Sequence, residues 1–314
     1  MNAVADVRYL QPAQFEQIDP RFDSEFGVYW ASMNAKPRPC FSPQLLLELR
    51  NFINTIVESD GSISHNGQQH PIRYAVLASK TPGIFNLGGD LALFRSAIVH
   101  RDRAQLERYA QLCVDDLFPW NQNFGLPVTT ISLVQGTALG GGFEAALASS
   151  VLIAEESSRM GFPEVLFNLF PGMGAYSFLQ RKVGRRVTEE LITSGNTYTA
   201  RQLYDMGVVD VITPDDTGEA AVYSYVRKHA RGGNGRRAFE SVRRELESVQ
   251  REELERVAQM WVDEALKLEE RDLKMMDRLV RAQQRNATDN IATFTLDRSM
   301  TPNARPLAAV GGND

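Results

Sequence analysis

Two glutamates near the middle of the chain, Glu144 and Glu164, have the residue type and the surroundings needed for proton transfer. They lie 20 positions apart, and Glu144 directly follows 27 residues, 117–143, that contain no Asp, Glu, Lys or Arg. A stretch of that length without charge indicates burial, and apolar surroundings raise the pKa of a carboxyl toward neutrality. Such a carboxyl can both take and give a proton. We therefore expect the two glutamates to form an acid and base pair, and the sequence leaves open which one is the acid.

Two glycine-rich turns, FNLGGD with Gly88 and Gly89 and ALGGGFE with Gly140 and Gly141, each lie between a predicted strand and a predicted helix. The first N–H groups of a helix have no partner within it and bind anions, and glycine lets a ligand approach them closely. One donor from each turn would form an oxyanion hole beside a developing enolate. Taken singly, a glycine run is more simply a tight turn, and a glutamate in a first helical turn is more simply a partner of the helix dipole. The order and spacing of the two glycine turns and the two glutamates favour a catalytic role over these simpler explanations.

Other common catalytic motifs are absent from the sequence, which contains no GxSxG, GK[ST], HExxH or CxxC. The two cysteines, Cys40 and Cys113, are too distant and too few for a disulfide framework or a cysteine metal site. Scattered polar surroundings favour surface positions for all four histidines: His65, His70, His100 and His229. We therefore expect no metal and no cofactor.

The composition is that of an ordinary folded protein with a sizeable core. Of 314 residues, 43% are hydrophobic and 23% are charged, which argues against disorder. The net charge of -5 is too balanced for a nucleic-acid surface or a polybasic membrane surface. The uncharged stretch contains Pro119, Pro127 and several polar residues, so it does not fit a membrane span, and the N-terminus lacks the apolar run of a signal peptide. We expect a cytoplasmic protein without a nucleic-acid partner.

Strands alternate with helices along most of the chain. Apolar and β-branched runs predict strands at Phe26–Met33, Ile72–Ser79, Thr129–Val134, Val151–Ala154 and Val208–Ile212. Helical spacing of apolar residues predicts helices at Pro43–Glu58 after the cap Ser42, and at Ala92–Leu117, Phe143–Ala148, Gly174–Val183, Thr188–Ser194 and Ala200–Met206. The alternation predicts an α/β fold.

The chain changes character after the loop RGGNG at 231–235. Residues 240–281 contain no Gly and no Pro, and 21 of these 42 residues are charged. One apolar stripe predicts a long helix or a broken helix pair: Leu254, Val257, Trp261, Ala265 and Leu268. We expect residues 1–230 to form a catalytic core with an N-terminal extension, residues 231–300 to form a helical cap that also joins subunits, and residues 301–314 to be a flexible tail.

The order of these motifs resembles the crotonase (enoyl-CoA hydratase/isomerase) superfamily. The resemblance rests on FNLGGD, QGTALGGGFE and FPEVLFNLFPGMG and covers roughly residues 20–215. It implies a crotonase-like spiral of ββα units that assembles as a trimer or a dimer of trimers. It also implies that the N–H groups of Gly141 and of Gly89, or its neighbour Gly88, bind the thioester oxygen, while Glu144 and Glu164 flank the α and β carbons of the substrate.

Within that superfamily the chain most resembles the bacterial diffusible-signal-factor synthases of the RpfF type. The resemblance is carried by YWASMNAKPRPCF, FNLGGDLALF, GTALGGGFEAALASS and FPEVLFNLFPGMGAYSFL. Ordinary hydratases tend to have PGxGGT where this chain has PGMGAYSF, which favours a specialised branch. The resemblance implies dehydration of a 3-hydroxyacyl group on acyl carrier protein to a cis-2-enoyl thioester, hydrolysis to a free fatty-acid quorum-sensing signal, and docking on a sensor histidine kinase.

Two alternatives stay open. One is an enoyl-CoA hydratase that acts on CoA esters, and the other is a catalytically inactive crotonase-fold protein that only binds a partner. The presence of both glutamates argues against the second.

A medium-length acyl tail needs an apolar slot. The candidates to line it are Leu139, Gly140 and Met173 from the glycine turns and the following segment, with Trp261 and Met276 from the helical cap. The simpler alternative is that a Met or Trp on a helical stripe belongs to the plain core.

Overall fold

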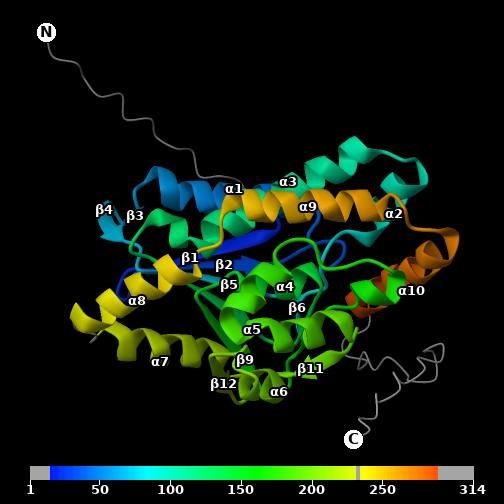
Figure 1. The fold of residues 1–314 in the computed structure, drawn as a ribbon. Coiled ribbons are helices and arrows are strands. Elements are labelled where there is room, and N and C mark those ends of the chain that lie inside the picture. The colour runs from blue at the N-terminus through cyan, green and yellow to red at the C-terminus, as the bar shows by residue number, and fades with distance from the viewer. Residues whose placement is uncertain (1–14, 231–233, 289–314) are drawn as a thin grey trace, which may run out of the picture.

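A computed structural model describes residues 15–230 and 234–288 of the chain. Its largest element is a six-stranded sheet in the order β1-β2-β5-β7-β9-β12 (Figure 1). β1 pairs antiparallel with β2, and the other neighbours are parallel. The strands are β1 (Ile18–Asp23), β2 (Val28–Met33), β5 (Tyr74–Ser79), β7 (Thr129–Val134), β9 (Val151–Glu155) and β12 (Val211–Thr213). The predicted α/β class is therefore confirmed.

Both faces of this sheet are buried. Along β5, Leu77 packs into one apolar cluster and Val76 into another, because successive side chains of a strand point to opposite faces. Helix α7 (Gly218–Ala230) covers the second cluster through Val222 and Val226. Burial on both faces explains why the central strands are nearly continuous apolar runs in the sequence.

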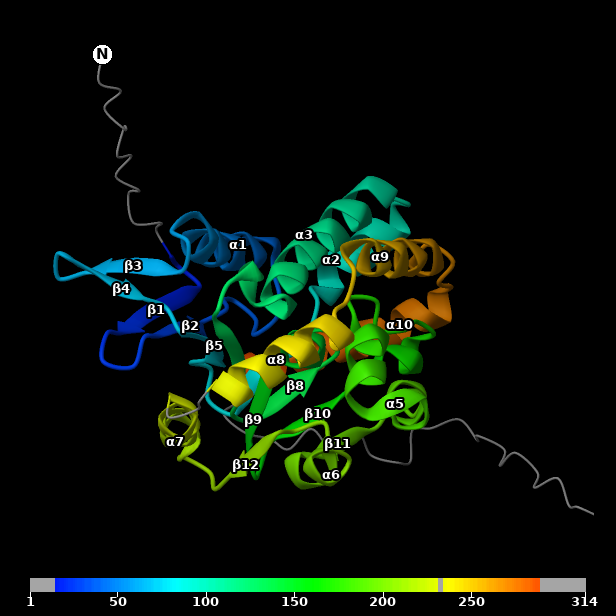
Figure 2. The ribbon, with the colours of Figure 1, turned by 60° about the vertical axis from the view of Figure 1, so that its left-hand side comes forward.

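A second sheet, in the order β11-β10-β8-β6, lies against the first (Figure 2). Its strands are β6 (Ile84–Asn86), β8 (Thr137–Leu139), β10 (Arg159–Gly161) and β11 (Thr197–Thr199). Three times the chain passes from the large sheet to the small one, from β5 to β6, from β7 to β8 and from β9 to β10. Each passage leads to helical structure: α2 (Leu91–Val99), α4 (Gly141–Leu147), or the short η2 (Glu164–Phe167) followed by α5 (Ala175–Thr193). This is the expected spiral of ββα units.

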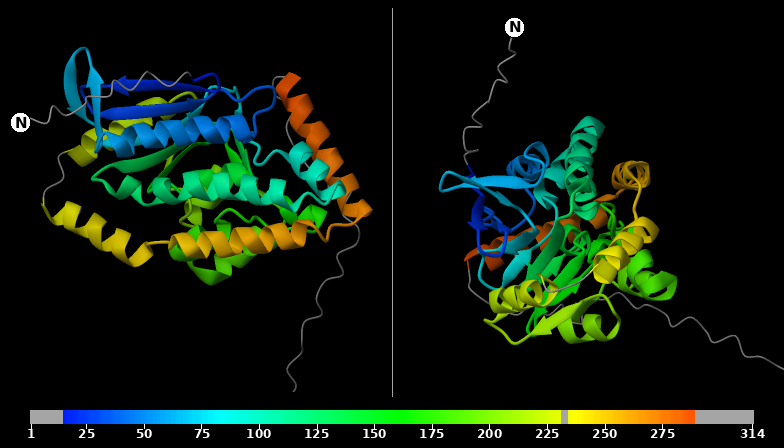
Figure 3. Two further views of the ribbon diagram at one scale, coloured as in Figure 1. Left: turned by 90° about the horizontal axis from the view of Figure 1, so that it is seen from above. Right: turned by 90° about the vertical axis from the view of Figure 1, so that its left-hand side faces the viewer.

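Helix α1 (Pro43–Glu58) has the bounds that the sequence predicts. The hydroxyl of Ser42 accepts the N–H of Leu45 at 3.1 Å and caps its first turn. α1 packs on α3 (Arg103–Asn121), and α3 packs on α9 (Arg251–Ala265), so the three helices lie side by side over the core (Figure 3, left). The remaining small elements are the hairpin β3 (Ser62–His65) and β4 (Gln68–Pro71), the turn η1 (Asn123–Gly125) and α6 (Ala200–Asp205).

Two predicted boundaries are wrong. The single helix expected at Ala92–Leu117 is two, α2 and α3, because Arg101 adopts a φ of 52° and Asp102 caps α3 by accepting the N–H of Gln105 at 2.9 Å. The two helices expected from Gly174 onward are confirmed as two helical segments of α5, because Gly184, with a φ of 77°, is non-helical and kinks the helix between them. β12 begins only at Val211, because Val208 and Val209 both donate to the carbonyl of Leu203 at the end of α6.

The C-terminal region forms three helices, α8 (Asn234–Glu247), α9 and α10 (Glu270–Thr288), instead of one helix or a pair. In the predicted stripe, Leu254, Trp261 and Ala265 of α9 are buried, and the other two residues are half-buried. α10 crosses to pack on α2 and η2. The predicted tail, 301–314, lies outside the described residues. None of the described helices combines the length and the apolar composition that crossing a bilayer requires.

Candidate active site

The two predicted glycine turns face each other. A β-carbon built on Gly141, the first residue of α4, would lie 3.5 Å from the backbone nitrogen of Gly89. Within the described residues, neither of these two N–H groups donates to a protein acceptor. The N–H of Gly88 instead donates to Oδ1 of Asn86 at 2.8 Å. Gly89 and Gly141 therefore have the arrangement of an oxyanion hole, and the geometry does not support Gly88 as a donor.

Tyr109 of α3 holds the Gly89 turn in place. Its hydroxyl donates to the carbonyl of Phe41 at 2.6 Å and accepts the N–H of Asp90 at 3.4 Å. Asp90 forms an ion pair with Arg38 at 2.7 Å. Because these bonds fix the loop, little reorganisation is needed to present the Gly89 donor to a ligand.

Glu144 sits in the first turn of α4 and is 2% exposed. Its Oε1 accepts the N–H groups of Met173 at 2.7 Å and Ala175 at 3.0 Å. Between these two donors, Gly174 adopts a φ of 117°, a conformation that side chains disfavour. Burial raises the pKa of Glu144 to about 7, and the two N–H donors counteract that rise by favouring the charged form.

Glu164 begins η2 and faces the triple glycine. Its Oε1 occupies the space that a β-carbon on Gly140 would need. Its Oε2 is buried and has no hydrogen-bond partner among the described residues. Burial, with a smaller contribution from the nearby Glu144, raises the pKa of Glu164 well above its ordinary value.

The two carboxyls therefore differ in their preferred charge. Two backbone donors, those of Met173 and Ala175, stabilise a carboxylate at Glu144, whereas Oε2 of Glu164 has no partner in the described protein and only a backbone hydrogen bond at Glu164 itself opposes the rise of its pKa. When the pair holds a single proton, that proton lies preferentially on Glu164, because burial and the nearby Glu144 raise its pKa while two backbone donors counteract the rise at Glu144. A pair in that state can take one proton and give another in the same reaction.

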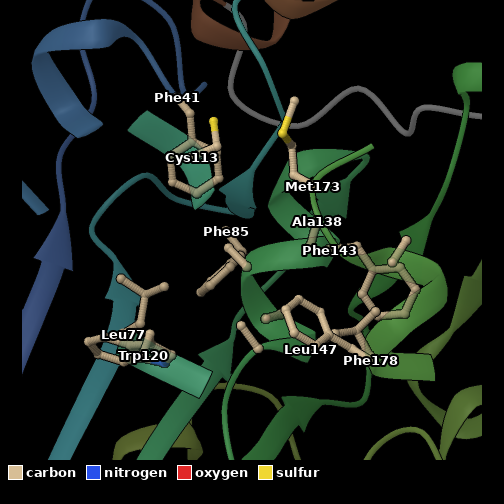
Figure 4. Packing of buried hydrophobic residues seen from close by; sticks show 14 of the residues in the cluster. Phe41, Leu77, Phe85, Cys113, Trp120, Ala138, Phe143, Leu147, Met173 and Phe178 are labelled. Atoms are coloured by element: carbon tan, nitrogen blue, oxygen red, sulfur yellow. The ribbon is translucent and has the colours of Figure 1, made fainter. Parts of the chain in front are cut away.

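The glycine turns and both glutamates line one cavity of about 980 Å³, including its opening to solvent. From there it extends between apolar side chains of α1 and α3. Five of the lining residues are labelled in Figure 4, with Phe41, Cys113 and Met173 toward one side of the buried cluster and Leu77 and Trp120 toward another. The lining, polar at the glycine turns and glutamates and apolar elsewhere, suits a ligand with one reactive polar end and an apolar tail.

The predicted lining of the slot divides into two groups. Gly140, Met173 and Trp261 line the cavity. Leu139 does not, because it packs with Ile84 and Leu87 in a separate small cluster, and Met276 is wholly buried in the main core. Leu139 and Met276 are therefore ordinary core residues, as the simpler alternative predicts.

Sequence reasoning missed the inner wall of the cavity. It is formed by residues of α1 and α3: Leu46, Leu49, Ile53, Cys113, Asp116, Leu117 and Trp120. The amphipathic spacing of both helices predicts that most of these side chains are buried, but spacing alone does not tell a packed face from one that borders a cavity.

The histidines and cysteines form no second catalytic site in the described residues. None of the four histidines lines the cavity, and no group of His, Cys, Asp and Glu there has the arrangement of a metal site. Cys40 and Cys113 are both buried and unlinked, and Cys113 borders the cavity. Burial raises the pKa of the Cys113 thiol well above its ordinary value, which disfavours a reactive thiolate.

Fold and site define a crotonase-type protein, and the chain belongs to the enoyl-CoA hydratase/isomerase family, whose model matches residues 53–285. It is 41% identical over 211 residues to the enoyl-CoA isomerase/hydratase fer4 of Mycosarcoma maydis, covering 67% of this chain and 71% of that protein. It is 27% identical over 213 residues to the probable mitochondrial enoyl-CoA hydratase 2 of Arabidopsis thaliana, covering 67% of this chain and 65% of that protein. The chain thus spans slightly less than two thirds of the Arabidopsis relative.

Solved structures share the fold at lower identity. DspI of Pseudomonas aeruginosa superposes with a TM-score of 0.63 at 19% identity, covering 87% of this chain and 98% of that one. Human mitochondrial delta3-delta2-enoyl-CoA isomerase superposes with a TM-score of 0.69 at 18% identity, covering 85% and 99%. These similarities show the crotonase fold.

Proposed function

We propose that this protein is a synthase of a cis-2-unsaturated fatty-acid signal of the diffusible-signal-factor type. Its substrate would be a 3-hydroxyacyl thioester on acyl carrier protein, and its product a free acid. The observation that carries the proposal is that two carboxyls and two unpaired N–H donors meet at one end of an apolar cavity.

The first step is dehydration. One carboxylate removes a proton from the α carbon, and the N–H groups of Gly89 and Gly141 stabilise the negative charge that develops on the thioester oxygen. The other carboxyl donates its proton to the β-hydroxyl, which leaves as water when the carbon–oxygen bond breaks. A pair that holds one proton has the composition this step needs, because it gains one proton and loses one.

The second step is hydrolysis. A carboxylate of the pair takes a proton from water as the water attacks the thioester carbonyl, and the same two N–H groups stabilise the tetrahedral oxyanion. The carbon–sulfur bond then breaks, the thiol of the carrier leaves with a proton, and the free acid remains.

The motifs support a signal synthase over a degradative enzyme. The segment PGMGAYSF, which departs from the PGxGGT of ordinary hydratases, supplies the N–H groups of Met173 and Ala175 that bind Glu144. The sequence difference from ordinary hydratases therefore lies in the segment that contacts Glu144. The resemblance also extends the proposal to a cytoplasmic trimer or hexamer that docks on a sensor histidine kinase.

The second candidate is an enoyl-CoA hydratase that acts on CoA esters. It is favoured by the relatives named as hydratases, including the Arabidopsis protein. This activity would use the same carboxyl pair and the same oxyanion hole.

Mass spectrometry of the products separates the two candidates. The protein is incubated with 3-hydroxydodecanoyl-acyl carrier protein, and in parallel with trans-2-dodecenoyl-CoA. A synthase releases free cis-2-dodecenoic acid from the first substrate. Absence of that acid, together with rapid hydration of the CoA ester, would contradict the synthase and establish the hydratase.

A further inference from the structure

One face of helix α3 forms part of the inner wall of the cavity. Tyr109, Cys113, Asp116, Leu117 and Trp120 all line the cavity. Tyr109 marks the reactive end, because its hydroxyl would lie 3.4 Å from a β-carbon on Gly89. Asp116 is seven residues further along, a rise of about 10 Å along the helix axis, which corresponds to roughly eight carbon atoms of an extended chain.

Asp116 is an unusual residue for this position. Its neighbours along the cavity include Leu46, Leu49 and Ile53 of α1 and Leu117 of α3. The indole N–H of Trp120 is already bonded to the hydroxyl of Ser149 at 2.7 Å. Asp116 therefore brings a carboxyl into a region that is otherwise suited to a hydrocarbon tail.

Only half of this carboxyl is used within the described protein. Its Oδ1 accepts a hydrogen bond from Nε of Arg50 at 2.9 Å. Its Oδ2 is buried and has no hydrogen-bond partner there, although the residue is 7% exposed. A buried polar atom without a protein partner is costly, so a ligand group that reaches Asp116 from the cavity would gain binding energy by supplying one.

Burial and an ion pair act on this carboxyl in opposite directions. Burial raises the pKa of Asp116 to about 8, and Arg50, whose Nη2 lies 2.9 Å from Oδ1, opposes the rise. In either charge state Oδ2 can accept a hydrogen bond. A hydroxyl can donate that bond without bringing another charge next to the ion pair.

From this geometry we infer that Asp116 is a specificity residue that binds a hydroxyl group on the distal part of the acyl chain. The ligand class is thus a hydroxylated medium-length fatty acyl group, with the hydroxyl about eight carbons from the carboxyl end. That the ligand is an acyl chain rests on the proposed function, but its preference for a hydroxyl group can be measured by binding, without turnover.

Binding of saturated fatty acids tests the inference, because these ligands do not react. Dissociation constants are measured by calorimetry for dodecanoic acid and for analogues with one hydroxyl at each carbon from about 7 to 11. We expect the wild type to bind one of these hydroxy acids roughly five- to ten-fold tighter than dodecanoic acid. A methyl group at that same carbon should give no such gain.

Two variants localise the effect. Asp116→Leu should abolish the preference for the hydroxyl. Asp115→Asn is the matched control, because Asp115 also pairs with Arg50, at 3.5 Å, but does not line the cavity. It should keep the preference.

Three results would overturn the inference: no hydroxy acid binds tighter than dodecanoic acid, the methyl analogue gains as much as the hydroxy acid, or Asp115→Asn loses the preference as Asp116→Leu does. The ligand series in the wild type decides the matter even if Asp116→Leu does not fold. Failure of the synthase assay with a retained hydroxyl preference would reject only the proposed function.

Discussion

A β-carbon on Gly140 would lie 2.3 Å from Oε1 of Glu164. The first glycine of the triple glycine thus leaves open the space that a carboxyl of the candidate pair occupies. Its backbone, at a φ of 50° and a ψ of -124°, also lies in a region that residues with a β-carbon rarely adopt. The missing side chain of Gly140 therefore allows Glu164 to lie where it does, while Gly141 beside it presents an N–H group.

Replacing Gly140 with alanine should displace Glu164. We expect kcat/KM to fall roughly 100-fold, because a shift of about 1 Å in a catalytic group has effects of that size. Gly67→Ala is the control, since Gly67 also has a positive φ, of 75°, but an added β-carbon would meet nothing within 4 Å. Comparable activity losses in folded samples of both variants would show that backbone strain, and not displacement of Glu164, is responsible.

Glu144→Gln and Glu164→Gln should each lower turnover by about 100- to 10,000-fold while the protein stays folded, because each removes one proton-transfer group. Glu155→Gln is a matched control, since Glu155 is also buried, accepts the N–H of Gly218 at 2.9 Å and lies outside the cavity lining. Turnover is measured as release of free acid. Unchanged release in both site variants would exclude the carboxyl mechanism and favour a binding protein.

The pH dependence of activity should be bell-shaped. At low pH both carboxyls are protonated and no base is present, and at high pH both are ionised and no acid is present. The acidic limb should fall near the pKa of about 7 of Glu144, and the basic limb should lie higher, because the pKa of Glu164 is raised further. A rate that keeps rising to pH 10 without a maximum would argue against a proton-donating carboxyl.

Stability should depend on pH through the same groups. A buried carboxyl whose pKa is raised on folding favours the native state only while it is protonated, so its contribution is lost as pH rises from the unfolded pKa to the folded one. For Glu144 that window runs from 4.5 to about 7, and the loss is about 3 kcal/mol. Thermal unfolding of Glu144→Gln and of the wild type should therefore give similar midpoints near pH 4.5, with the variant more stable at pH 8. Parallel curves across this range would refute the raised pKa.

Trp261 should limit the size of the acyl group. It lines the cavity, meets Phe94 edge to face with ring centroids 4.9 Å apart, and packs so closely on Gly172 that no β-carbon fits there. Trp261→Ala should shift the ratio of kcat/KM toward longer acyl chains by about ten-fold and cost about 3–5 kcal/mol of stability. Met260→Ala, at a neighbouring residue that is 60% exposed, should change neither. An unaltered chain-length profile in folded Trp261→Ala would place the tail elsewhere.

Local signals predicted several elements well. Ser42 and the apolar spacing that follows it predict α1 with its observed bounds, because a cap and an amphipathic stripe are both properties of neighbouring residues. The break between α2 and α3 was missed, since Arg101 is not a residue type that commonly adopts a positive φ. The cavity wall was missed as well, because which buried face borders empty space depends on how helices distant in sequence pack.

The sequence by itself determined the family and the spiral of ββα units and predicted the pair of glutamates, because the glycine turns and the spacing of these residues are local patterns. Only the tertiary structure decided which groups lie together. It directs the N–H of Gly88 to Asn86 and leaves those of Gly89 and Gly141 unpaired. It also supplies two backbone donors to Glu144 but leaves Oε2 of Glu164 without a partner in the described protein. It also places Asp116 in the inner wall of the cavity. Hydrogen bonding and desolvation are set by neighbours far apart in the chain, and these two effects separate the pKa values of otherwise identical carboxyls.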